Sequence, residues 1–217
     1  MLVWAAFPIA FWRGDRTLAA SHVQLLDEWS TGPSFGYWRA WRQCYEQTVA
    51  LGDNDRSAAF QARLAAILKT AREPVFGDVL GTLREELAGP ESLARAESGA
   101  AGWCGAELLR AHGERLLQQG DDASAAGPEK LFVRAMDLAG AQGALSWELR
   151  SATSLARVWH SQGRGDDARA VLTRVCDRFA EGFDTQDMRR AVTLLKSVGG
   201  NRGTTRRRVA VSGIGSC

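Results

Sequence analysis

The sequence has no phosphate-binding loop, because the pattern GxxxxGK[ST] is absent from its 217 residues. The four cysteines (Cys44, Cys104, Cys176 and Cys217) are widely separated and form neither a CxxC motif nor a zinc-type cluster. The opening apolar run, residues 1–12, is too short to span a membrane and follows no basic stretch. We therefore expect no metal, no cofactor and no membrane span, and we interpret the cysteines as buried free thiols of a reducing cytoplasm.

An excess of positive over negative charge is absent outside the C-terminus. Four of the 27 basic residues, but none of the 25 acidic ones, lie in residues 199–217, which leaves 23 basic and 25 acidic residues elsewhere. The body is therefore slightly acidic, and its composition does not favour direct nucleic-acid binding. An apolar content of 45% with 24% charged residues is typical of a soluble globular protein.

Proline is also rare, at 5 residues, and strong helix formers fill most segments. Apolar residues recur at helical spacing, as in Leu149, Ala152, Ala156 and Trp159. We predict an all-α chain of about ten helices, in which Asp166 and Asp184 cap helices beginning at the next residue.

Glycine followed five residues later by alanine marks two predicted helix–helix turns, at Gly14 with Ala19 and at Gly163 with Ala168; Gly120 marks a third turn. Glycine allows a tight turn, and alanine lets the second helix approach the first closely. Such pairs cannot bury their apolar faces alone, so they stack. We predict a right-handed α-solenoid of tetratricopeptide-like antiparallel helix pairs over residues 1–198, and a flexible Gly/Arg tail over 199–217.

Several segments resemble a narrower family. SWELRSATSLARVW, QGRGDDARAVL and FAEGFDTQDMRRAVTLL, with PIAFWRGD and YWRAWRQCYE nearer the start, are similar to the C-terminal helical-repeat region of large bacterial signalling ATPases. The resemblance covers roughly residues 5–197 and is strongest after Cys104. Residues 74–103 depart from it and look shortened by about one helix. The hydrophobic start suggests that Met1 does not begin the full biological unit.

Proteins of that family carry an ATPase core behind a winged-helix or adenylate/guanylate cyclase domain. The resemblance therefore implies a cytoplasmic, non-catalytic interaction or sensor module that binds a protein or peptide and lacks the ATPase core. One alternative is a chain classed as an ATPase or cyclase through its parent architecture. Another is a remnant gene product without independent activity. The oligomeric state stays open.

Two sets of residues are candidates for a partner groove. Trp38, Trp41 and Tyr45 share one helix face beside Arg42, and aromatic and arginine side chains are common interface anchors. The competing interpretation is that these rings fill the space between stacked helices. Arg150 and Arg157, seven residues apart, are predicted either to line a concave face or to face solvent. The adjacent acids Glu85 and Glu86 fit a helix start better than a catalytic pair.

Overall fold

The computed structural model describes residues 2–51, 57–71, 73–119 and 126–200, which form eleven α-helices, four short helical turns and no β-strand. This confirms the prediction of an all-helical chain. Gly120 and residues 201–217 of the predicted tail lie outside the described residues. The helices are α1 (Phe7–Trp12), α2 (Arg16–Trp29), α3 (Gly36–Ala50), α4 (Ala58–Thr70), α5 (Pro74–Leu83), α6 (Pro90–Ser98), α7 (Gly105–Gln119), α8 (Ala126–Ala141), α9 (Leu145–Ser161), α10 (Gly165–Cys176) and α11 (Gln186–Gly200); the turns are η1 (Leu2–Ala6), η2 (Pro33–Phe35), η3 (Glu85–Leu87) and η4 (Gly102–Cys104).

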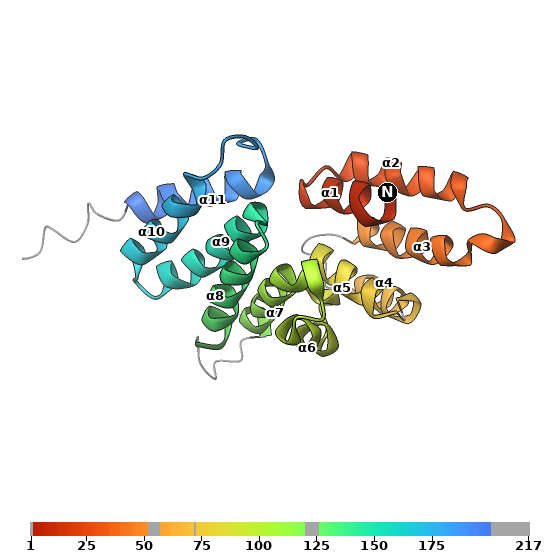
Figure 1. Cartoon of the computed structure of the whole chain (residues 1–217), viewed down its shortest axis with the longest axis horizontal. Helices are drawn as coiled ribbons and strands as arrows, with labels where there is room; N and C mark the ends of the chain where they lie inside the picture. Colours follow the sequence, from red (N-terminus) through yellow and green to blue (C-terminus); the bar gives the residue numbers. More distant parts are fainter. Residues whose placement is uncertain (1, 52–56, 72, 120–125, 201–217) are drawn as a thin grey trace, which may run out of the picture.

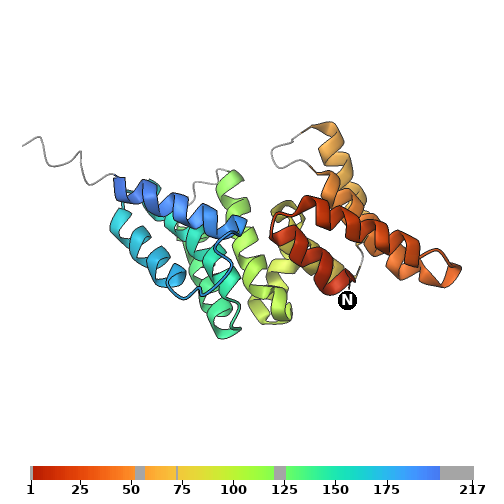
Figure 2. The ribbon, with the colours of Figure 1, turned by 90° about the horizontal axis from the view of Figure 1, so that it is seen from above.

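Helices that follow one another in sequence mostly pack against one another. From α7 to α11 each helix contacts the next, and α9 also contacts α7 and α11. In Figure 1 the helices α1–α4 form one end of the molecule, α8–α11 form the other, and α5–α7 lie between them. Figure 2 shows the same order from above. The segment 74–103 contributes the two short helices α5 and α6, which both pack on α7.

The interior consists of two main apolar clusters that meet on α8. One is built from α1 to α8 and includes Leu131, whereas the other runs from Phe132 to Val198. Close approach of α7 and α8 depends on Gly113, because a Cβ atom there would lie 2.6 Å from the Phe132 ring. Glycine at this position lets the aromatic ring pack directly on the α7 backbone.

Three turns share one hydrogen-bond pattern. At Gly14 the amide donates to Phe11 O, and the next amide donates to the carbonyl five residues before it; Gly143 and Gly163 repeat both bonds. All three glycines have positive φ, as this helix C-cap requires. Ala19 and Ala168 are fully buried after two of these turns. The predicted turns at Gly14 and Gly163 are thus present, and Gly143 adds one that was not predicted.

Two predicted helix caps are displaced by one position or more. Thr185, rather than Asp184, accepts the Met188 amide at 3.4 Å at the start of α11. Helix α10 begins at Gly165, so Asp166 lies inside its first turn. An acidic residue in this turn lies near the positive end of the helix dipole.

Candidate functional site

A groove of about 820 Å³ lies on the described surface and is here called the central groove. Its walls come from α1, α2, α7, α9 and α11, from the end of α5 and from the start of η3. It is strongly polar, since ten of its eighteen lining residues are charged. They are Phe11, Trp12, Arg16, Leu83, Arg84, Glu85, Glu86, Arg110, Glu114, Leu117, Gln118, Arg150, Thr153, Ser154, Arg157, Gln186, Asp187 and Arg190.

The N-terminal helices approach the start of the last helix at this groove. The turn between α1 and α2 lies against the start of α11, because a Cβ atom on Gly14 would lie 2.6 Å from Gln186 Oε1. Figure 1 shows α1 and the start of α11 facing each other. The groove is therefore bordered by segments that are far apart in sequence.

A buried carboxylate on α7 anchors the groove floor. Glu107 is completely buried and accepts hydrogen bonds from Arg110 Nε at 3.0 Å and Arg110 Nη2 at 2.8 Å. Arg150 of α9 places its Nη2 atom 2.9 Å from the same carboxylate. Two guanidinium groups thus compensate the charge of Glu107, as a buried carboxylate requires.

A second carboxylate extends this network toward the groove opening. Glu114 accepts hydrogen bonds from Arg110 Nη1 at 3.3 Å, Ser154 Oγ at 2.5 Å and Arg157 Nη2 at 2.5 Å. Asp187 at the start of α11 lies 4.0 Å from Arg150. The network therefore joins α7, α9 and α11 through charged side chains, and it positions the arginines of the groove.

Helical spacing explains why these side chains converge. Glu107, Arg110 and Glu114 are three and four residues apart on α7, so they share one face of that helix. Arg150, Ser154 and Arg157 follow at spacings of four and three on α9. The two faces meet because α7 and α9 contact each other directly.

The environment of the groove shifts the pKa values of several of its titratable groups. Burial raises the pKa values of the Glu85 and Asp187 carboxyls above their usual range, although Arg110 and Arg150, respectively, oppose the shift. Burial alone would lower the pKa of Arg110, but Glu107 and Glu114 outweigh it and raise that pKa. Arg110 therefore keeps its charge inside the protein.

Arg150 and Arg157, two of the predicted groove residues, both line the central groove. Their partners Glu107, Arg110, Glu114 and Ser154 were not singled out from the sequence. Glu85 and Glu86 were interpreted as residues of a helix start, and they lie in η3 on the groove wall. The signal that could have found the α7 residues was the spacing of three and four residues between Glu107, Arg110 and Glu114.

Two of the aromatic residues that were candidates for a partner groove lie outside the central groove. Trp41 and Tyr45 of α3 are buried in the core, where Trp41 stacks on Phe76 and Tyr45 stacks on Phe7, each with ring centroids 3.8 Å apart. Their placement corrects the partner-groove hypothesis for these two rings and agrees with the interpretation that they fill space between helices. The interior position of each ring is set by its partner on another helix.

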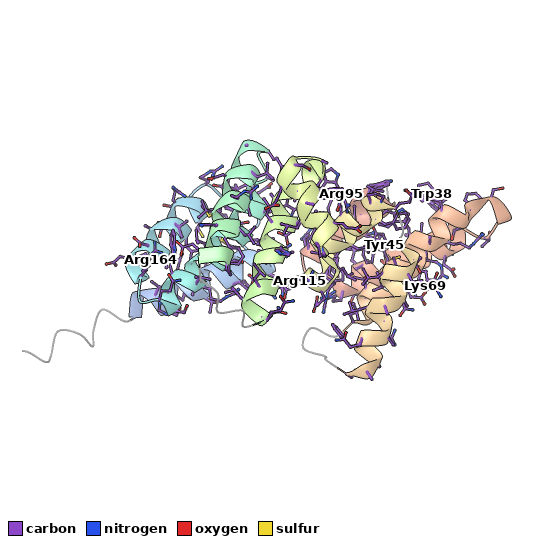
Figure 3. All side chains as sticks on the ribbon, turned by 90° about the horizontal axis from the view of Figure 1, so that it is seen from below. Trp38, Tyr45, Lys69, Arg95, Arg115 and Arg164 are labelled. Carbon is purple, nitrogen blue, oxygen red and sulfur yellow. The ribbon has the colours of Figure 1, made fainter. Side chains whose placement is uncertain are left out.

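The other two α3 candidates are more exposed. Trp38 forms an edge contact with Tyr37 and is part of no groove wall described above, and Figure 3 labels it together with Tyr45. Arg42 pairs with Asp27 at 3.2 Å and with Glu46 at 2.9 Å. Neither residue contributes to the central groove.

A second hollow of about 800 Å³ adjoins the central groove and shares Trp12, Arg150 and Asp187 with it. Trp12 also contacts Trp103 and Trp147, with ring centroids 6.1 and 5.5 Å away. Its indole N–H donates to the Thr82 carbonyl at 3.1 Å. These contacts hold Trp12 as a wall between the two hollows.

The described residues contain no cluster of three or more His, Cys, Asp or Glu side chains suited to a metal ion. Burial raises the pKa values of the Cys44 and Cys104 thiols to about 12, which keeps both protonated and poorly nucleophilic at neutral pH. Among the helices described, none has both the length and the apolar content needed to cross a membrane.

Comparison of the chain with known proteins gives no further assignment. No family model, no curated protein and no solved structure matches it.

Proposed function

We propose that this chain is a non-catalytic protein-interaction module that binds an extended segment of a partner protein in the central groove. The observation that supports this most is the groove floor, where the buried carboxylates Glu107 and Glu114 form ion pairs that orient Arg110, Arg150 and Arg157. Side chains fixed in advance lose little entropy on binding, so they suit recognition. The groove is polar, whereas small-molecule sites are mostly apolar.

The finer architecture that we propose is a right-handed α-solenoid of tetratricopeptide-like antiparallel pairs. Two features support it: the sequential packing of α7 to α11, and the repeated glycine turns at Gly14 and Gly163 with buried alanines after them. Together with the sequence resemblance, this favours a cytoplasmic interaction or sensor module of a bacterial signalling ATPase or transcriptional regulator. In such a protein the module would bias a separate ATPase core.

Groove-dependent peptide selection tests this function. A random peptide library displayed on phage is selected against the whole chain, and bound clones are compared on Thr153→Trp and Thr173→Trp variants. Thr153 lines the groove and Thr173 is exposed on α10 outside it. We expect clones that lose binding to Thr153→Trp, where the indole fills the groove, but retain binding to Thr173→Trp. Recovery of no such clones would contradict the proposal.

The alternative is that the chain itself acts on nucleotides, as the ATPases it resembles do. That activity needs a backbone-amide cradle and a lysine for the phosphates, and the sequence has no motif that supplies them. We expect no heat of binding when the chain is titrated with Mg-ATP in a calorimeter. Saturable binding, abolished by Arg157→Gln, would replace the interaction module with a nucleotide site in the groove.

A further inference from the structure

We propose that the partner segment is acidic, and that its carboxylates bind Arg157 and Arg190 at the opening of the central groove. This inference rests on the proposed function and specifies the chemistry of its partner. Arg157 projects from α9 and Arg190 from α11, and both side chains line the groove. A ligand held by both would bridge the two helices.

The carboxylates of the groove are largely occupied by the protein itself. Glu86 is held by Arg84 at 3.1 Å, Glu114 by two arginines and a serine, and Asp187 lies beside Arg150. Glu85 accepts a hydrogen bond from Gln118. A basic ligand would therefore compete with these protein partners for the carboxylates of the groove.

The arginine side chains at the groove opening, in contrast, keep N–H groups that no protein acceptor among the described residues binds. Each arginine has five N–H groups, and Arg157 directs one nitrogen to Glu114 while its side chain stays 56% exposed. Arg190 is exposed and forms no ion pair with any other residue in the described ranges, although its charge acts on Asp187. Charge-assisted N–H donors therefore face the open groove, where they match carboxylates and backbone carbonyls.

The charged residues that line the groove also favour an acidic ligand. Six arginines line the groove against four acidic residues, and Glu107 beneath the floor reduces this excess without removing it. A groove with excess positive charge attracts acidic segments and disfavours basic ones.

Single-stranded nucleic acid is the competing anionic ligand, and the groove lacks what it needs. Such strands bind through bases stacked on open aromatic faces beside the positive charge. The two aromatic side chains of the groove are Phe11 and Trp12. Arg16 covers the Phe11 ring at 3.9 Å, and Trp12 packs against Trp103 and Trp147. A peptide needs no such stacking, so an acidic peptide fits better.

Fluorescence anisotropy with a labelled octaglutamate peptide tests the inference on the whole chain, at about 0.1 M ionic strength, where charges act over about 10 Å. We expect saturable binding that the double variant Arg157→Gln/Arg190→Gln weakens at least about tenfold. The matched control Arg174→Gln/Lys196→Gln removes the same two charges from α10 and α11 outside the groove. It should bind octaglutamate as the parent does, and labelled octalysine should not bind.

The inference is overturned if octaglutamate does not bind, or if both double variants weaken binding equally, since net charge alone would then explain it. Tighter binding of an oligothymidine that depends on Arg157 and Arg190 would assign the groove to nucleic acid instead. The phage-selected clones separate the two proposals. Groove-dependent clones without acidic residues would leave the interaction module intact and reject the acidic partner.

Discussion

Replacing Arg110 with methionine is expected to lower the free energy of unfolding by about 3–5 kcal/mol, because it leaves a buried carboxylate undercompensated. Glu107 is completely buried and would lose both hydrogen bonds from Arg110, keeping only Arg150. Methionine retains much of the apolar part of the arginine side chain, so the loss of stability reflects mainly the missing positive charge. Urea denaturation followed by far-ultraviolet circular dichroism measures it, provided that the m-value is unchanged.

Two further variants identify the cause of that loss. Arg134→Met breaks the exposed pair with Glu97 on the molecular surface and should cost no more than about 1 kcal/mol. Adding Glu107→Gln to Arg110→Met removes the buried charge as well and should recover part of the loss. Equal losses in Arg110→Met and Arg134→Met would show that the floor network is not a buried ionic structure.

Local sequence signals predicted the helices and two of their turns, because the chemistry of a helix end lies in neighbouring residues. Gly14 and Gly163 were predicted from a glycine followed by an alanine five residues later. Gly143 forms the same turn with the same two hydrogen bonds, but Glu148 stands where that alanine would be. Glu148 is buried and accepts from Arg178. The positive φ of the glycine, rather than the alanine, is thus the common requirement.

The groove floor could be predicted only in part, since its ion pairs cross between helices. The spacing of Arg150 and Arg157 was visible in the sequence and placed them on one face. Their carboxylate partners Glu107 and Glu114 lie some forty residues earlier. Helical periodicity defines a face within one helix but does not state which other helix covers it. The packing of α7 on α9 supplies that information.

The second large effect is expected on the free energy of unfolding when a buried aromatic residue of α3 is replaced. Trp41→Ala is expected to lower the free energy of unfolding by about 3–5 kcal/mol, the usual cost of removing a large buried aromatic side chain. Trp41 is fully buried between Phe76 and Tyr45, so alanine leaves a cavity bordered by rings. Trp38→Ala, on the same helix, should change stability by less than about 1 kcal/mol, because Trp38 is partly exposed. Urea denaturation compares the two variants.

A third substitution at Trp41 separates the contribution of the aromatic ring to stability from that of the indole N–H. The Trp41 indole N–H is buried and has no hydrogen-bond partner among the described residues, which itself costs stability. Trp41→Phe keeps an aromatic ring against Phe76 and removes that N–H, so it should cost much less than Trp41→Ala. If Trp41→Ala and Trp38→Ala were equally mild, Trp41 would not be a core residue, and the hypothesis of an aromatic partner surface on α3 would be restored. A large loss in Trp41→Ala with a small one in Trp41→Phe would show that the aromatic ring of Trp41 stabilises the protein through packing in the core.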